Sequence, residues 1–105
     1  MLKPVPQLIA EAAAGVQQVS SAQAQQIEGV AMIDVREPAE CAAQPVAGST
    51  NIPRGLLEMK IGEIVHDPAM PICVHCASGA RAVLAAEQLL RLGYQNVVAL
   101  DPGKD

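Results

Sequence analysis

The feature that most constrains the fold is an apolar run of strand length that leads directly into a helical pattern. The run, MPICVHC, covers residues 70–76, and the helical pattern, GARAVLAAEQLLRLG, covers residues 79–93 and ends in a glycine. A short continuous apolar run is typical of a strand that is buried on both faces of a parallel sheet. Because parallel strands are joined by crossover connections, usually helices, the two segments predict one strand-helix unit of an α/β sheet.

Strand and helix patterns alternate along the rest of the chain. VAMIDVREP, residues 30–38, is a second apolar run, and it ends in charged residues and a proline, as a buried strand does at its carboxyl end. The other strand candidates are residues 16–19, around 50–52 and 94–101, and the other helical segments run from Ser20 or Ser21 to Gly29 and over residues 38–44 and 56–65. This alternation predicts an α/β fold with a mostly parallel central sheet of about five strands and helices on both faces.

The length of the chain fits one domain. With 105 residues and no linker, internal repeat or low-complexity segment, the sequence offers no boundary that would divide it. Residues 1–15 carry apolar side chains and alanines before a glycine, a pattern that suits a short helix or a loosely attached arm. We therefore expect an N-terminal helix or arm over residues 1–15 and one domain over residues 16–105, as a monomer or a weak dimer.

Charge and aromatic content exclude two classes of partner. Seven basic against eleven acidic residues give a formal net charge of −4, and Tyr94 is the only aromatic residue. The chain therefore lacks the basic surface that attracts polyanions or anionic membranes, and it lacks aromatic side chains on which unpaired bases could stack. The first residues also lack a signal-peptide core, so we expect a cytoplasmic protein that binds neither nucleic acid nor a membrane.

Cys76 is the candidate nucleophile. It stands at the carboxyl end of the predicted 70–76 strand, which is where ligands bind in open α/β sheets. Four small residues follow it: Ala77, Ser78, Gly79 and Ala80. Their backbone N–H groups can converge on one point because no bulky side chain blocks them, and the following helix directs its own free N–H groups there, which stabilises a thiolate. Arg81 adds a cation suited to an anionic, oxygen-bearing group on a substrate.

A buried, inert role is the alternative for these residues. Free cysteine is among the most buried residue types, and an arginine on a helix is often simply solvated. For Cys76, the strand end, the small-residue turn, the helix start and the arginine together favour reactivity. Cys73, inside the predicted strand, is expected in the core. The CVHC spacing also suits a metal or a redox pair, but a redox CxxC begins at a helix and a zinc site needs a second ligand pair, so no metal is expected.

Three further polar residues lie near the predicted strand ends. His75 directly precedes the nucleophile, and since neighbours on a strand face opposite sides, we do not expect it to act as a base for Cys76. Asp34 and Arg36 lie near the carboxyl end of the first apolar run. A structural ion pair, for instance between Arg36 and Glu40, is at least as good an interpretation of these two residues as contact with a substrate.

The segment from Cys76 to Arg81 resembles the active-site loop of the rhodanese-like sulfurtransferases, in which CxxGxR follows the central strand. Here the loop reads CASGAR. IDVREPAEC resembles the DVRxxxE segment of that family, and PVAGSTNIPRG resembles its GHIxGAxNIP segment. Because LGYQNVVAL is similar to the strand after the active-site helix, the resemblance covers roughly residues 16–100.

This resemblance implies a two-step sulfur transfer without a metal or an organic cofactor. Cys76 would take a sulfane sulfur from a small-molecule donor such as thiosulfate and hold it as a persulfide. It would then pass the sulfur to cyanide or a thiol, with a protein thiol as a further candidate acceptor. The resemblance also implies that the amides of residues 77–81 cradle the sulfur and that Arg81 holds the oxyanion of the donor.

Two other functions stay open at this point. One is a non-catalytic rhodanese-like module that carries sulfur or recognises a partner. The less favoured one is a phosphatase or arsenate reductase, because family members of that kind have a longer CxxxxxR loop, whereas four residues separate Cys76 from Arg81 here. The smaller loop suits a single sulfur atom better than a tetrahedral anion. Family members usually continue past the last strand, so the domain is expected to be shortened at its C-terminus.

Overall fold

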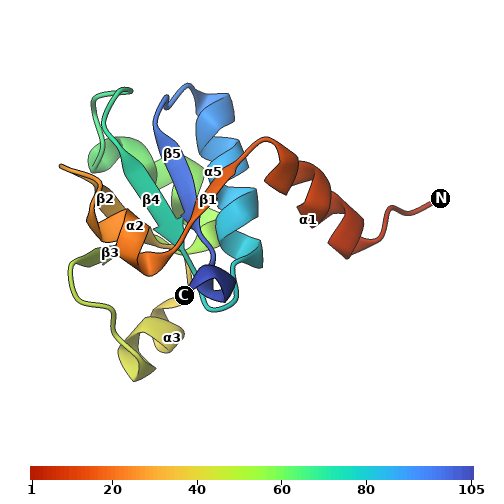
Figure 1. The fold of residues 1–105 in the computed structure, drawn as a ribbon, viewed down its shortest axis with the longest axis horizontal. Helices are drawn as coiled ribbons and strands as arrows, with labels where there is room; N and C mark the ends of the chain where they lie inside the picture. Colours follow the sequence, from red (N-terminus) through yellow and green to blue (C-terminus); the bar gives the residue numbers. More distant parts are fainter.

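Five parallel strands form the centre of the computed structural model, which describes all of residues 1–105 (Figure 1). Their order along the sheet is β1-β5-β4-β2-β3, and every pairing is parallel. The predicted α/β fold with about five mostly parallel strands is therefore confirmed. The strands are β1 (Gln17–Val19), β2 (Ala31–Asp34), β3 (Ser49–Asn51), β4 (Ile72–His75) and β5 (Val97–Leu100).

Helices and short 3-10 turns connect the strands. The helices are α1 (Val5–Ala14), α2 (Ser21–Gln25), α3 (Pro38–Ala43), α4 (Leu57–Lys60) and α5 (Ala80–Leu92). The 3-10 turns are η1 (Arg54–Leu56), η2 (Ile61–Glu63) and η3 (Pro102–Lys104). The helix expected from Ser20 to Gly29 is shorter than predicted, and the one expected over residues 56–65 is divided between α4 and 3-10 turns. No helix is long and apolar enough to cross a bilayer.

Local sequence signals explain several of these bounds. The Ser20 hydroxyl accepts a hydrogen bond from the N–H of Gln23 at 3.1 Å, and the Gln23 side chain accepts one from the N–H of Ser20 at 2.9 Å. This reciprocal capping box starts α2 at the predicted serine. At the end of α5, Gly93 takes a left-handed conformation with φ of 113°, which closes the helix where the sequence places a glycine.

The apolar core lies mostly on one face of the sheet. On that face, α1, α4 and α5 pack over the strands, and the largest fully buried side chains include Ile33, Leu57, Ile61, Ile72 and Leu89. The opposite face has a much smaller buried cluster, in which Ala24 of α2 covers Val19 and Cys73. Helices therefore cover both faces, but most of the free energy gained by burying apolar surface comes from the α5 face.

The N-terminal helix is attached to this core by its last turns. Ala12 is buried in the main core, and Ile9 and Ala13 pack partly against it. Val5 and Leu8, in the first turns, are exposed. Figure 1 shows the N-terminal end of α1 projecting away from the sheet and its covering helices.

The direction of the chain crossings changes between β2 and β4. After β2 the chain moves outward to the edge strand β3, whereas after β4 it moves to the other side, to β5. The segments that follow β2 and β4 therefore diverge at the carboxyl ends of these neighbouring strands, and this is the usual ligand position in open α/β sheets. The segment after β2 contains α3, and the segment after β4 contains Cys76.

Two leucines of α5 test how far stability depends on the core side of this helix. Leu89 is fully buried, whereas Leu92 is 53% exposed. We predict that Leu89→Ala lowers the free energy of unfolding by about 2–5 kcal/mol, because it leaves a cavity that the packed core cannot fill. The matched variant Leu92→Ala should change it by less than about 0.5 kcal/mol. Urea unfolding followed by circular dichroism measures both, and equal losses would contradict this description of the core.

Candidate functional site

The sulfur of Cys76 lies at the carboxyl end of β4 and accepts two backbone hydrogen bonds. The N–H of Gly79 donates to Sγ at 3.1 Å, and the N–H of Ala82 donates to it at 3.3 Å. Cys76 is half-buried, with its side chain against the main core. Two backbone donors therefore hold the sulfur at the start of α5, in a residue that is only partly buried.

The backbone of the loop explains why these two amides reach the sulfur. Gly79 caps the start of α5 in a left-handed conformation with φ of 103°, which a residue with a Cβ rarely adopts. Ala82 is the third residue of α5, so its N–H is one of the four that have no partner inside the helix. Ala77 and Ser78 are exposed at the tip of the loop, and their N–H groups make no hydrogen bond to the sulfur.

Arg81, on the first turn of α5, is paired with Glu40 of α3. Its Nη1–H donates to Oε1 at 2.7 Å and its Nη2–H donates to Oε2 at 3.0 Å, so the two planar groups are joined edge to edge by two hydrogen bonds. Hydrogen bonds from Arg81 lower the pKa of Glu40 to about 2, and the same bonds raise the pKa of Arg81. The site thus contains the arginine that the sequence indicated, with a carboxylate bound to it.

Asp34 and Arg36 form a buried ion pair at the end of β2. The guanidinium of Arg36 reaches the Asp34 carboxylate at 2.8 Å and the carbonyl oxygen of Gln44 at 2.8 Å. Burial opposes the charge on Asp34, but the hydrogen bonds from Arg36 outweigh it and lower the pKa of this carboxyl. Asn51 then ties β3 to this strand end by donating to the carbonyls of Asp34 and Arg36, each at 2.9 Å. The pair serves the architecture of the strand end.

His75 faces the side of the sheet opposite Cys76. Its Nε2 lies 2.6 Å from the hydroxyl of Ser49, and it borders a cavity of about 300 Å³ together with Met32 and Leu100 on the α2 face. Burial lowers the pKa of His75. The expected alternation of side chains along β4 is therefore present, and the imidazole does not share a face with the sulfur.

The other two cysteines occupy different environments from Cys76. Cys73 is fully buried beside Val19, as the sequence predicted, and burial raises its pKa to about 11. Cys41 is half-buried; its thiol donates to Asp34 at 3.4 Å, and burial followed by that hydrogen bond raises its pKa. All three cysteines are free thiols. No group of three or more His, Cys, Asp or Glu side chains is arranged to hold a metal ion.

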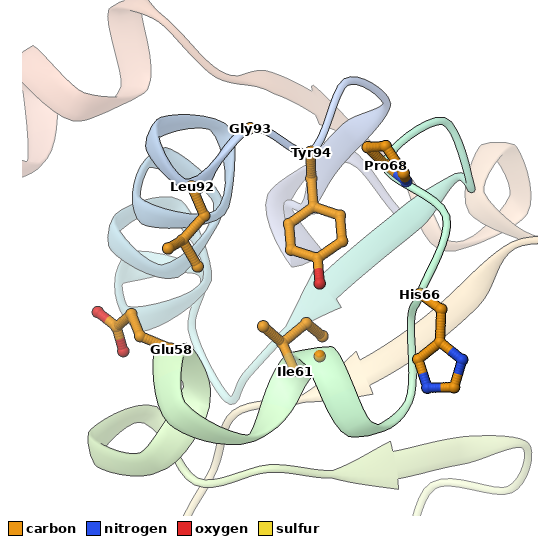
Figure 2. Close-up of a pocket in the computed structure, with 8 residues that line it drawn as sticks. Glu58, Ile61, His66, Pro68, Leu92, Gly93 and Tyr94 are labelled. Atoms are coloured by element: carbon orange, nitrogen blue, oxygen red, sulfur yellow. The ribbon is translucent and has the colours of Figure 1, made fainter.

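A cavity of about 290 Å³ lies far from this chemistry, at the opposite end of α5 (Figure 2). It is bordered by Ile61, His66, Leu92 and Tyr94, and Figure 2 shows the Tyr94 ring reaching toward Ile61. The Tyr94 hydroxyl is already used, since it donates to the carbonyl of Val65 at 2.8 Å. With 13 residues, α5 separates this cavity from the Cys76 loop by about 20 Å. It therefore contributes nothing to the loop.

Sequence reasoning missed three contacts of the site. Glu40 was considered as a partner for Arg36, but Arg36 pairs with Asp34 and Glu40 pairs with Arg81. The N–H of Ala82 lies one residue beyond the predicted cradle of residues 77–81, although the rule that the first helical amides lack partners could have identified it. No sequence signal indicated that Ser49 would bind His75.

Comparison with known proteins assigns the family. The profile of the rhodanese-like domain matches residues 17–105. The chain belongs to the rhodanese-like domain family. It is 33% identical over 76 residues to a sulfurtransferase of Allochromatium vinosum, an alignment that covers 72% of this chain and 69% of that protein. It is 32% identical over 83 residues to the thiosulfate sulfurtransferase GlpE of Pseudomonas fluorescens, covering 78% of this chain and 73% of that one.

A solved structure agrees with this assignment. The rhodanese-related protein of Thermoplasma volcanium superposes with a TM-score of 0.70 at 32% identity, covering 81% of this chain and 83% of that one. This rhodanese-like domain therefore shares both sequence and fold with its relatives.

Gly79→Ala tests whether the left-handed turn holds an amide on the sulfur. We predict a loss of about 1–2 kcal/mol in stability from backbone strain. We also predict that iodoacetamide alkylates Cys76 about threefold more slowly, because the displaced N–H no longer donates a hydrogen bond to the reacting sulfur. Gly48→Ala is the matched control, since Gly48 also has a positive φ, of 80°, and its added Cβ would meet open space. It should lower stability without slowing alkylation, and slowing in both variants would contradict the role of Gly79.

The burial of His75 predicts a pH dependence of stability. Because its folded pKa lies below the ordinary value of 6.5, the unfolded chain takes up a proton at about pH 6.5 and the folded chain does so only at lower pH. The free energy of unfolding should therefore fall as the pH drops from 7.5 to 5.5. His75→Gln should flatten this dependence in urea titrations, whereas His66→Gln, at an exposed histidine, should keep it. If the free energy of unfolding of His75→Gln depended on pH as steeply as that of the wild type, His75 would not be the source of the pH dependence.

Proposed function

We propose that this protein is a sulfurtransferase that carries sulfur as a persulfide on Cys76. The observation that carries the proposal is the pair of N–H groups, from Gly79 and Ala82, that donate to the sulfur at the start of α5. Hydrogen bonds to an ionised group are about twice as strong as neutral ones, so this position favours the thiolate and its anionic persulfide. The family and the sulfurtransferase relatives support the same chemistry.

The reaction takes place in two displacements. In the first, the Cys76 thiolate attacks the sulfane sulfur of a donor such as thiosulfate; a new sulfur-sulfur bond forms at Cys76, the donor bond breaks, and sulfite leaves with the electron pair. In the second, cyanide or a thiolate attacks the outer sulfur and the Cys76 thiolate is released. Each step exchanges one bond for another, so no external oxidant or reductant is consumed. This is covalent catalysis by an activated nucleophile.

The surrounding residues have distinct roles in this proposal. The amides of the loop formed by Ala77, Ser78, Gly79 and Ala80 line the position of the outer sulfur, and those of Ala80 and Arg81 have no partner inside the helix. Arg81 binds the oxyanion of the donor. Asp34 and Arg36 keep the neighbouring strand end in place through their buried ion pair.

Intact mass measurement tests the persulfide directly. After incubation with thiosulfate, we predict that the protein gains the mass of one sulfur atom and loses it on addition of cyanide. Cys76→Ser should gain none. Cys41→Ser is the matched control, because Cys41 is also half-buried but receives no loop amide, and it should gain sulfur like the wild type. An equal gain in Cys76→Ser would contradict the proposal.

Steady-state thiocyanate formation separates an enzyme from a carrier module. An enzyme forms many equivalents of thiocyanate per protein molecule when thiosulfate and cyanide are both in excess. A sulfur carrier or recognition module that thiosulfate reloads slowly or not at all forms at most about one equivalent over the same time. Hydrolysis of an aryl phosphate with no gain of sulfur would instead favour the phosphatase alternative.

A further inference from the structure

The pairing of Arg81 with Glu40 reduces the positive charge and the number of free N–H groups that the loop presents to a sulfur donor. Both terminal nitrogens of the guanidinium donate to one carboxylate, at 2.7 and 3.0 Å. We propose that Glu40 is the donor-selecting residue of the site: by holding Arg81, it disfavours oxyanion donors such as thiosulfate and favours organic persulfides. This inference rests on the persulfide chemistry proposed above and narrows its donor.

Glu40 is fixed from two sides. Besides the two bonds from Arg81, its Oε1 accepts a hydrogen bond from the N–H of Glu37 at 2.9 Å, which closes the first turn of α3. Arg81 is held in turn by the first turn of α5. Because a planar guanidinium and a planar carboxylate match through two parallel hydrogen bonds, the pair has a preferred geometry as well as a charge attraction.

The other arginines at this end of the sheet are also paired with carboxylates. Arg36 is bound to Asp34 and to the carbonyl of Gln44, and Arg54, which follows β3, is bound to Glu58. The chain as a whole has a net charge of −4. An approaching dianion therefore meets a neutral pair on an acidic protein, and it must displace Glu40 before it can accept the two parallel N–H groups that Glu40 holds.

Because the Arg81–Glu40 pair is partly exposed to solvent, it hinders oxyanion donors but does not exclude them. The side chains of Arg81 and Glu40 are 36% and 37% exposed, so water and salt screen their attraction and donor oxyanions can compete for the guanidinium. Glu40 remains ionised throughout the physiological range, since hydrogen bonds from Arg81 lower its pKa to about 2. The selection therefore operates at every pH at which the protein is expected to work.

The two donor classes deliver the same sulfur to Cys76 but make different demands on Arg81. With thiosulfate, the Cys76 thiolate takes the outer sulfur and sulfite leaves as a dianion that needs a cation. With an organic persulfide, R–S–SH, the Cys76 thiolate takes the outer sulfur, the S–S bond of the donor breaks, and the thiolate R–S⁻ leaves. The second reaction is equally balanced and involves no oxyanion, so it proceeds with Arg81 still bound to Glu40.

Glu40→Gln tests the inference with two donors. The change removes the charge and keeps an oxygen that can accept the N–H of Glu37. We expect the second-order rate constant for persulfide formation on Cys76, followed by intact mass, to rise about fivefold with thiosulfate, the scale of a partly exposed charge pair. With the persulfide of N-acetylcysteine methyl ester, which has no oxyanion, the rate constant should change less than twofold. Glu37→Gln removes an exposed charge nearby without a bond to Arg81, and it should leave the ratio of the two rate constants unchanged.

The other outcomes overturn the inference in distinguishable ways. An unchanged rate with thiosulfate, or an equal rise with both donors, would show that Glu40 does not select the donor, while Cys76 would still form its persulfide. An equal shift of the donor ratio in Glu37→Gln would reduce the effect to general charge and would also reject a specific role for Glu40. If Cys76 gained sulfur from neither donor in the wild type, the proposed function itself would fail, and this inference with it.

Discussion

The two backbone amides that hold the Cys76 sulfur are the interaction on which the rest of the site depends. Their position is set by how α5 sits on the sheet. Three alanines of this helix, Ala82, Ala85 and Ala86, are fully buried, and such small side chains let the helix approach β4 and β5 closely. This packing places the first turn of α5 at the carboxyl end of β4. The left-handed conformation of Gly79 connects the two elements. The position of the sulfur's donors therefore depends on the packing of Ala82, which supplies one of the two N–H groups, and of Ala85 and Ala86 about one turn further along the helix.

The charges around this sulfur are arranged in pairs. Asp34 neutralises Arg36 in the buried end of β2, and Glu40 binds Arg81 at the surface. The two ion pairs differ in burial and therefore in their ability to exchange partners. The first is 8% or less exposed on both sides, so breaking it would leave an uncompensated buried charge and disturb the strand end. The second is partly solvated and can exchange partners, so only this pair is able to respond to a ligand.

The sequence predicted the parts of the molecule that depend on local patterns. Apolar runs identified β2 and β4, a glycine located the end of α5, and the spacing from Cys76 to Arg81 located the loop. The partners of the charged residues could not be predicted in the same way. Glu40 and Arg81 are 41 positions apart and meet only because the segments after β2 and β4 leave the sheet at adjacent points. Hydrophobic periodicity contains no information about such a contact, and the expected partner of Arg36 was wrong for that reason.

The attachment of α3 links these observations. None of the residues of α3 is buried, so the helix gains little from apolar packing. Polar contacts hold it instead: Glu40 binds Arg81, Cys41 donates to Asp34, and the carbonyl of Gln44, just after the helix, accepts from Arg36. A donor that takes Arg81 from Glu40 therefore removes one of the few contacts that fix this helix. The free energy lost by loosening α3 therefore reduces the free energy gained when Arg81 binds an oxyanion. This cost is a physical basis for the proposed preference for donors that leave the Arg81–Glu40 pair intact.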